Sequence, residues 1–211
     1  MNKWYCIGFK IKWNRKSSSD FSEDLIIIDL LIVPLIKQFG SDIILWRFHR
    51  RATDDEKGHS LRFIFYGSDE LSKEVFSWTD DSEFIKVIND NLLEEKVNKE
   101  IFNDGVDSEK IEVTSDKSWP IEIQKTWPYY IDGVCKMFIN LMKEIKIRIG
   151  EPKDKNNFEE LKRYYKKLED EIAKYWLEYG WHSFLHHIGA IFGYEPTNPY
   201  PRGNKNGAII L

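Results

Sequence analysis

Residues 42–67 read DIILWRFHRRATDDEKGHSLRFIFYG, and this stretch decides the fold. Apolar and polar side chains alternate with a period of two on both sides of a charged segment that ends at Gly58. This pattern is typical of two half-buried strands joined as a hairpin. The aromatic residues that would share one face are Trp46, Phe48, Phe63 and Phe65. The sequence therefore predicts a hairpin whose aromatic side chains face a core.

The opposite face of this hairpin would carry Arg47, His49, Arg62 and Tyr66. Guanidinium groups on such a face would form a site for a carboxylate or a phosphate, because arginine binds both through paired hydrogen bonds. The same charges could also simply be solvated, as most charged side chains on strands are. A slip of one residue would turn the aromatic set outward. We therefore predict that Arg47 and Arg62 lie on neighbouring antiparallel strands with their side chains on the same face.

The chain before the hairpin predicts one strand and one helix. Residues 4–13 alternate cleanly between apolar and small or charged side chains, as a strand does. Asp20 and Glu23 resemble a capping box for a helix that Gly40 would end and Pro34 would kink. The order strand, helix, strand, strand is typical of an α+β fold with a mainly antiparallel sheet and helices packed on it.

The rest of the chain is expected to be mainly helical. The expected elements are two short helices in 69–99, short strands at 111–113 and 121–124, a helix starting around Thr126 and Pro128 and running to about 147, a long helix ending at Gly180 and a short helix at 181–192. We expect one domain over 1–211, sheet-rich over 1–125 and helical over 126–193, with an irregular tail over 194–211.

Composition excludes several classes of protein. The 211 residues carry a net charge of -4, which argues against a dedicated nucleic-acid binder. The only cysteines, Cys6 and Cys135, predict neither a disulfide scaffold nor a structural zinc site, so we expect a cytoplasmic protein. The N-terminus lacks a signal-peptide pattern, and the most apolar segment, 25–36, is too short to span a bilayer. We expect no cofactor, no metal and no membrane contact.

Two further positions could take part in chemistry. Lys125 lies just before a predicted helix, although an ordinary surface lysine is the simpler interpretation. His182 and His186 are separated by four residues, a spacing that can chelate a metal, but no third ligand is evident nearby. His187 falls on the same helical stripe as Phe184 and could act as a general base, or it could be a packed, hydrogen-bonded histidine.

Four segments, taken in order, resemble the C-terminal glutamate-elimination domains of class I lantibiotic dehydratases and their free-standing thiopeptide-type relatives. The segments are ILWRFHR, HSLRFIFYG, EIQKTW and FLHHIGAIFG. By this resemblance Arg47, Arg62 and Lys125 match arginines of the family's motifs, and His187 matches a histidine. The chain departs from the motifs at Ile64, at Lys125, at Trp127–Pro128, and at Gly189 and Ala190.

The resemblance implies maturation of a ribosomally made peptide of the lanthipeptide or thiopeptide type. In elimination, Arg47 and Arg62 would hold carboxylates, Lys125 would supply a charge and His187 would be the base; His49 and Tyr66 would help to bind substrate. In the alternative, a [4+2] pyridine-forming cyclisation, Trp127 and Tyr130 would shape the pocket. The third option is a non-catalytic partner of a precursor peptide. The implied partners are a leader–core precursor peptide and a separate glutamylating dehydratase, and a homodimer is left open.

Overall fold

The computed structural model describes residues 1–16, 19–152, 154, 157–180, 183, 185 and 187–191. It divides into two compact units, residues 1–169 and 170–211, which are treated separately below. The first unit contains the sheet and most of the helices, so it confirms the α+β class and places the candidate site. In the described part of the chain no helix is long and apolar enough to cross a membrane.

The predicted hairpin forms one side of a four-stranded antiparallel sheet, with β2 at the edge. Strands β2 (Leu45–Ala52) and β3 (His59–Ser68) pair along their length, and the order across the sheet is β2-β3-β1-β4. The turn closes through a hydrogen bond from the Gly58 amide to the Asp55 carbonyl, and Gly58 adopts a φ of +57°. Glycine accepts that left-handed conformation without steric cost.

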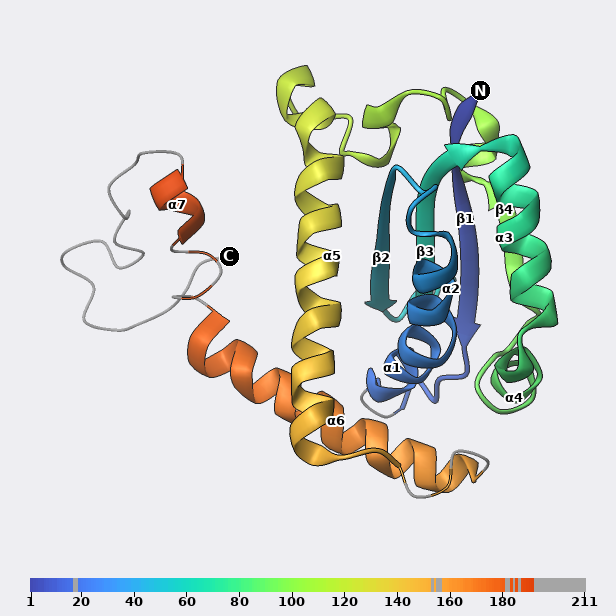
Figure 1. Cartoon of the computed structure of the whole chain (residues 1–211), viewed down its shortest axis with the longest axis vertical. Coiled ribbons are helices and arrows are strands. Elements are labelled where there is room, and N and C mark those ends of the chain that lie inside the picture. Colours follow the sequence, from blue (N-terminus) through green and yellow to red (C-terminus); the bar gives the residue numbers. More distant parts are fainter. Residues whose placement is uncertain are drawn as a thin grey trace. The chain divides into compact units, whose positions relative to one another are not determined.

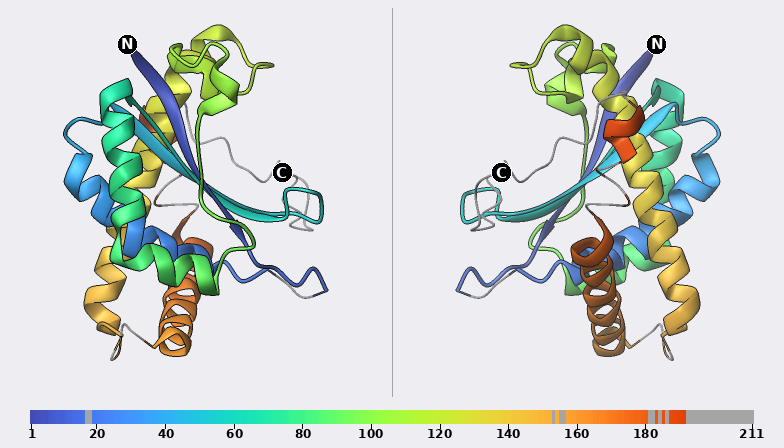
Figure 2. Two further views of the ribbon diagram at one scale, coloured as in Figure 1. Left: turned by 90° about the vertical axis from the view of Figure 1, so that its right-hand side faces the viewer. Right: turned by 90° about the vertical axis from the view of Figure 1, so that its left-hand side faces the viewer.

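Strand β1 (Asn2–Ile11) lies between β3 and the short edge strand β4 (Asn98–Ile101). Its alternate side chains Tyr5, Ile7, Phe9 and Ile11 are buried with Leu61, Phe63 and Phe65 of β3. This confirms the strand that the sequence predicts near 4–13. Figures 1 and 2 show the helices α1, α2 and α3 on this side of the twisted sheet. The aromatic face of the hairpin therefore forms the main core.

The helical run that covers this face changes its winding before Pro34. It consists of α1 (Ser22–Ile27), the π-helical turn η1 (Ile28–Ile32) and α2 (Val33–Phe39), and it ends before Gly40 as expected. Proline has no amide hydrogen for the carbonyl four residues earlier, and its ring crowds that carbonyl. A π turn widens the helix at this point, so the predicted disturbance at Pro34 takes this form.

Two further helices follow β3, as predicted: α3 (Asp69–Asp81) and α4 (Glu83–Asn91). Ser68 and Ser82 cap them, since their hydroxyl oxygens accept hydrogen bonds from the amides of Leu71 and Phe84. Such caps satisfy amides at the helix start that have no partner within the helix.

A second, smaller apolar cluster lies on the opposite face of the sheet. It contains Trp4, Cys6, Leu45, Ile64 and Phe102. The segment after β4 covers it with two 3-10 turns, η2 (Phe102–Gly105) and η3 (Ile111–Thr114). The short strand predicted at 111–113 is therefore wrong. The indole of Trp4 donates to the carbonyls of Lys110 and Ile111, which ties this segment to the sheet.

Helix α5 (Ile121–Ile149) begins earlier than the sequence predicts, so the strand expected at 121–124 is wrong. Pro128 lies inside the helix instead of near its start, and it leaves the carbonyl of Gln124 without its helical donor. The hydroxyl of Ser115 donates to that carbonyl over 2.7 Å. This contact from the segment just before the helix allows the helix to continue through the proline.

Helix α6 (Phe158–Gly180) ends at the predicted glycine. Its first half belongs to the sheet-containing unit, where Asp29 of η1 accepts hydrogen bonds from Lys146 Nζ (2.5 Å) and Tyr165 Oη (2.6 Å). This partly buried carboxylate therefore holds η1, α5 and α6 together. Of the helix predicted at 181–192, the structure describes α7 (His187–Ile191); the predicted tail at 194–211 lies outside the described residues.

The Ser115 contact predicts a coupled effect on stability. Ser115→Ala should lower the free energy of unfolding by about 1–2 kcal/mol, because the partly buried Gln124 carbonyl loses its donor. In a Pro128→Ala background the loss should be smaller, since the new amide at 128 can serve that carbonyl.

Urea denaturation of the four proteins in this cycle measures the coupling. The exposed Ser77→Ala in α3 is the control and should change the free energy of unfolding by less than about 0.5 kcal/mol. Equal losses for Ser115→Ala in both backgrounds would contradict the assignment of the hydroxyl to the freed carbonyl.

Candidate functional site

The strand register places the predicted polar residues together. His49 is paired with Arg62, and Arg47 is paired with Ile64, one row further along the same hairpin. Directly opposed residues share a face, and so do residues two apart on one strand. Arg47, His49 and Arg62 therefore lie on the face opposite the aromatic core, as predicted. As diagonal neighbours, Arg47 and Arg62 have Cα atoms roughly 7–8 Å apart.

Arg47 is a half-buried cation that has no acidic partner among the described residues. One of its terminal nitrogens donates to the carbonyl of Thr114 over a long 3.4 Å. Its Nε is buried and makes no hydrogen bond to the described residues. Burial lowers the pKa of the Arg47 guanidinium, and the positive charge of Arg62 also lowers it. Because arginine stays protonated in proteins, the fold holds a destabilised positive charge at this position.

Arg62 and His49 add to this positive charge. Among the described residues the exposed Arg62 side chain makes no hydrogen bond or ion pair. His49 is accessible to solvent, but the atoms packed around its ring lower its pKa. The charges of Arg47, Arg62 and Arg51 lower it further. His49 is therefore held in its neutral form near pH 7, next to two arginines.

Other cations on the sheet have acidic partners. Arg51 pairs with Asp55, Lys10 with Glu95 at 2.8 Å, and Arg50, on the helix-covered face, with Glu169 at 2.9 Å. The Arg47–Arg62 pair differs from these residues because no acidic side chain among the described residues pairs with either arginine. A bound carboxylate or phosphate would relieve the repulsion between the two guanidiniums. We call Arg47, His49 and Arg62 the cationic face.

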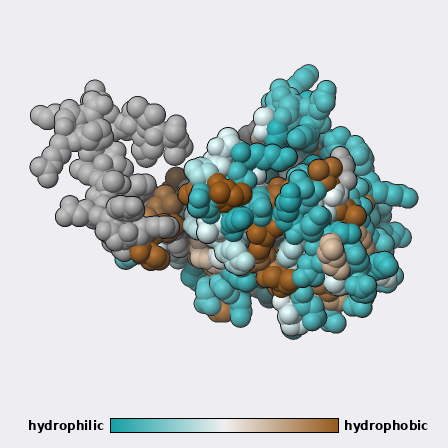
Figure 3. Space-filling view, turned by 90° about the horizontal axis from the view of Figure 1, so that it is seen from above, coloured by the Kyte–Doolittle hydropathy of each residue, from teal (hydrophilic) through white to brown (hydrophobic). Residues whose placement is uncertain are grey.

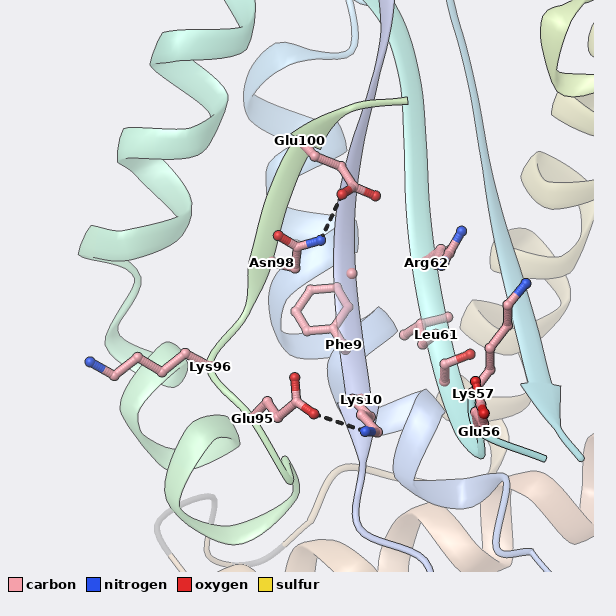
Figure 4. A pocket seen from close by; sticks show the side chains of 12 residues that line it. Phe9, Lys10, Glu56, Lys57, Leu61, Arg62, Glu95, Lys96, Asn98 and Glu100 are labelled. Atoms are coloured by element: carbon pink, nitrogen blue, oxygen red, sulfur yellow. Dashed lines mark hydrogen bonds and ion pairs between the residues drawn. The ribbon is translucent and has the colours of Figure 1, made fainter. Parts of the chain in front are cut away.

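A groove of about 240 Å³ lies beside the cationic face (Figure 4). Its lining includes Gly8, Lys10, Arg62, Asn98 and Glu100. Arg62 belongs to both features, whereas Arg47 and His49 are not part of the groove lining. Asn98 and Glu100 could not be predicted from the sequence, because β4 is a four-residue, mainly polar strand without the alternation of the hairpin.

Tyr66 shares the same face but serves mainly in packing. Its ring lies 5.1 Å from that of Trp4, measured between centroids, and its hydroxyl donates to the carbonyl of Glu109 over 2.7 Å. Burial and the neighbouring Glu109 raise the pKa of Tyr66. These contacts make Tyr66 part of the second apolar cluster, which fixes the cover over one end of the cationic face.

The remaining residues expected in the first unit lie near the start of α5. Lys125 is exposed, and Trp127 packs between Trp119 (centroids 5.0 Å apart) and Tyr130 (5.3 Å). Seen from this end of the molecule, the surface is mainly hydrophilic with separate small apolar groups (Figure 3). Helix α5 contacts β2 at Asp132, since the Oδ1 atom of Asp132 accepts a hydrogen bond from the Trp46 amide. Lys125 precedes Asp132 by about 10 Å along the helix axis.

The predicted histidine base belongs to the second unit. His187 is exposed in α7, while His182 and His186 lie outside the described residues. Its relation to the cationic face therefore stays a prediction. In the described ranges, no three histidine, cysteine, aspartate or glutamate side chains gather closely enough to hold a metal.

Comparison with family models, curated proteins and solved structures found no match to the chain. The geometry of the cationic face and the motif resemblance are therefore the features that bear on function.

The cationic face predicts how His49 titrates. In the native protein its pKa should lie below the usual 6.5, and Arg62→Gln should raise it toward 6.5 by removing one positive neighbour. The folded state then binds fewer protons than the unfolded state below about pH 6.5. The contribution of His49 should therefore lower the free energy of unfolding as pH falls through this range. The decrease should be smaller in Arg62→Gln.

Imidazole resonances followed by NMR between pH 4.5 and 8.5 measure this pKa directly. Lys73→Gln, which neutralises an exposed cation in α3 on the other side of the sheet, is the matched control and should leave the His49 pKa in place. If Arg62→Gln leaves the His49 pKa unchanged, the charge of Arg62 does not act on the His49 ring and the prediction is wrong.

Proposed function

We propose that this chain is a maturation enzyme for a ribosomally made peptide, and that it eliminates glutamate from glutamylated serine or threonine to give dehydroamino acids. The observation that supports this most is the cationic face, where two arginines on neighbouring strands have no acidic partner among the described residues. The hairpin motifs that resemble the elimination domains contain these same two arginines. The proposed partners are a precursor peptide and a separate glutamylating dehydratase.

The reaction needs a base and a binding site for the departing glutamate. The base takes the Cα proton of the esterified residue, the electron pair forms the Cα=Cβ bond, and the Cβ–O bond breaks to release glutamate as a carboxylate. Negative charge moves onto the leaving carboxylate as this bond breaks. Guanidiniums that are already in place would stabilise that charge without rearranging. Arg47 is the better fixed of the two, since its Nε is buried and a terminal nitrogen contacts Thr114.

His49 is the base that the geometry favours. It is paired with Arg62 across the hairpin, and its lowered pKa keeps the ring neutral and able to accept a proton near pH 7. The resemblance instead points to His187, which lies in the second unit. The variants His49→Gln and His187→Gln distinguish these two candidates, because only loss of the true base should lower turnover by about 10²–10⁴-fold.

One observation favours the non-catalytic alternative. Lys125, Trp127 and Tyr130 belong to α5 and are not part of the groove lining, so these expected residues do not gather around Arg62. A partly exposed aromatic cluster next to a lysine also suits simple peptide binding. A protein that only holds a precursor peptide would need no base beside the cationic face.

The activity assay uses the full chain and a precursor peptide glutamylated beforehand, with release of glutamate followed by mass spectrometry. Arg62→Gln should lower turnover about tenfold to a hundredfold, because the transition state loses a charge-assisted contact. The fold should stay intact, since Arg62 is exposed. Lys125→Ala should cost less, because lysine offers a point charge without a fixed pair of donors.

The control is Lys73→Gln, which removes one positive charge far from the cationic face and should keep full turnover. If the chain releases no glutamate from this peptide but converts a dehydroalanine-containing precursor into a cyclised product and free leader, cyclisation replaces elimination. Binding of the precursor with neither product would favour the non-catalytic partner.

A further inference from the structure

The groove beside Arg62 has a carboxylate on its other side. Across the sheet, Arg62 is paired with Gly8 and Gly8 with Asn98, while Cys6 in the next row is paired with Glu100. Strands β3 and β4 are two spacings apart, which puts Arg62 and the β4 residues about 10 Å from one another at the backbone. Arg62 and Glu100 therefore border one groove, whose lining also includes the oppositely charged Glu56 and Lys57 of the turn (Figure 4).

Strand β1, which forms the floor of the groove between β3 and β4, has small, uncharged side chains there at Gly8 and Cys6. At Gly8 an added Cβ would meet only Asn98, at 3.8 Å, so a side chain there would rise into open space above the strand. Burial raises the pKa of the neighbouring Cys6 to about 12, so its thiol carries no charge near pH 7. The floor therefore leaves room for a ligand and does not compete for its charged groups.

Glu100 is free to receive a cation. It accepts a hydrogen bond from Asn98 Nδ2 over 2.9 Å, which orients the carboxylate, and no lysine or arginine among the described residues pairs with it. Lys10 is already paired with Glu95 (2.8 Å) and Glu94 (3.5 Å). Lys96, although it lines the groove, points away from Glu100 (Figure 4).

From this arrangement we infer that the groove binds a dipolar amino-acid group, with its ammonium at Glu100 and its carboxylate at Arg62. The inference rests on the proposed function, because Arg62 belongs to the cationic face as well. A glutamyl ester has one free ammonium and one free carboxylate, so it is a ligand of this kind. Glu100 would then determine specificity, because it distinguishes such a group from a simple dicarboxylate.

The test compares two probes on the full chain by isothermal titration calorimetry: L-glutamate, and N-acetyl-L-glutamate, which lacks the ammonium. The native protein should prefer L-glutamate about tenfold, the ratio that corresponds to 1.4 kcal/mol. Glu100→Gln keeps the shape and the contact to Asn98 but removes the charge, so it should abolish this preference. Gly8→Leu should weaken both probes by filling the groove.

The matched control is Glu74→Gln in α3, an exposed carboxylate far from the groove, and it should keep the native preference. If Glu100→Gln keeps the native preference for L-glutamate, the inference is overturned. It is also overturned if the native protein binds both probes equally and Arg62→Gln still weakens both. In either case the cationic face would stand. If neither probe binds the native protein, both the ammonium site at Glu100 and the carboxylate site at Arg62 are overturned.

Discussion

The pairing of β2 with β3 is the constraint on which the rest of the structure depends. With Phe48 opposite Phe63 in the register, every second side chain of the hairpin enters the main core. The side chains between them must then face the other way, and these include Arg47, His49 and Arg62. A slip of one residue would bury the arginines and expose the aromatic rings, so packing fixes both faces at once. The cationic face is thus a consequence of the core on the other side of the sheet.

The two faces of the sheet are covered very differently. Helices cover the aromatic face, where Phe138 of α5 packs against Phe48, whereas the 102–114 segment covers only one end of the other face. This partial cover is what half-buries Arg47 against Thr114 while Arg62 stays exposed beside the groove. An arginine in such a position has lost part of its water without gaining a carboxylate. That imbalance is the physical reason to expect an anionic ligand at this face.

Much of the fold could be predicted because its signals are local. The alternation in β1 and in the hairpin, and the glycine stops at Gly40 and Gly180, are confirmed. The start of α5 could not be predicted, because it depends on Ser115 reaching a carbonyl that Pro128 leaves open. Within the site, the shared face of Arg47 and Arg62 followed from periodicity. Asn98 and Glu100 could not be found in this way, since the short polar strand β4 joins them to the groove only through tertiary pairing.

A crystal structure of the full chain grown with L-glutamate tests the central claim, that the cationic face binds a carboxylate, most directly. The account predicts a carboxylate held by hydrogen bonds from the guanidiniums of Arg47 and Arg62, with the Arg47 Nε satisfied. A structure in which both arginines pair with acidic side chains of the protein itself, while the glutamate lies elsewhere or is absent, would contradict the account.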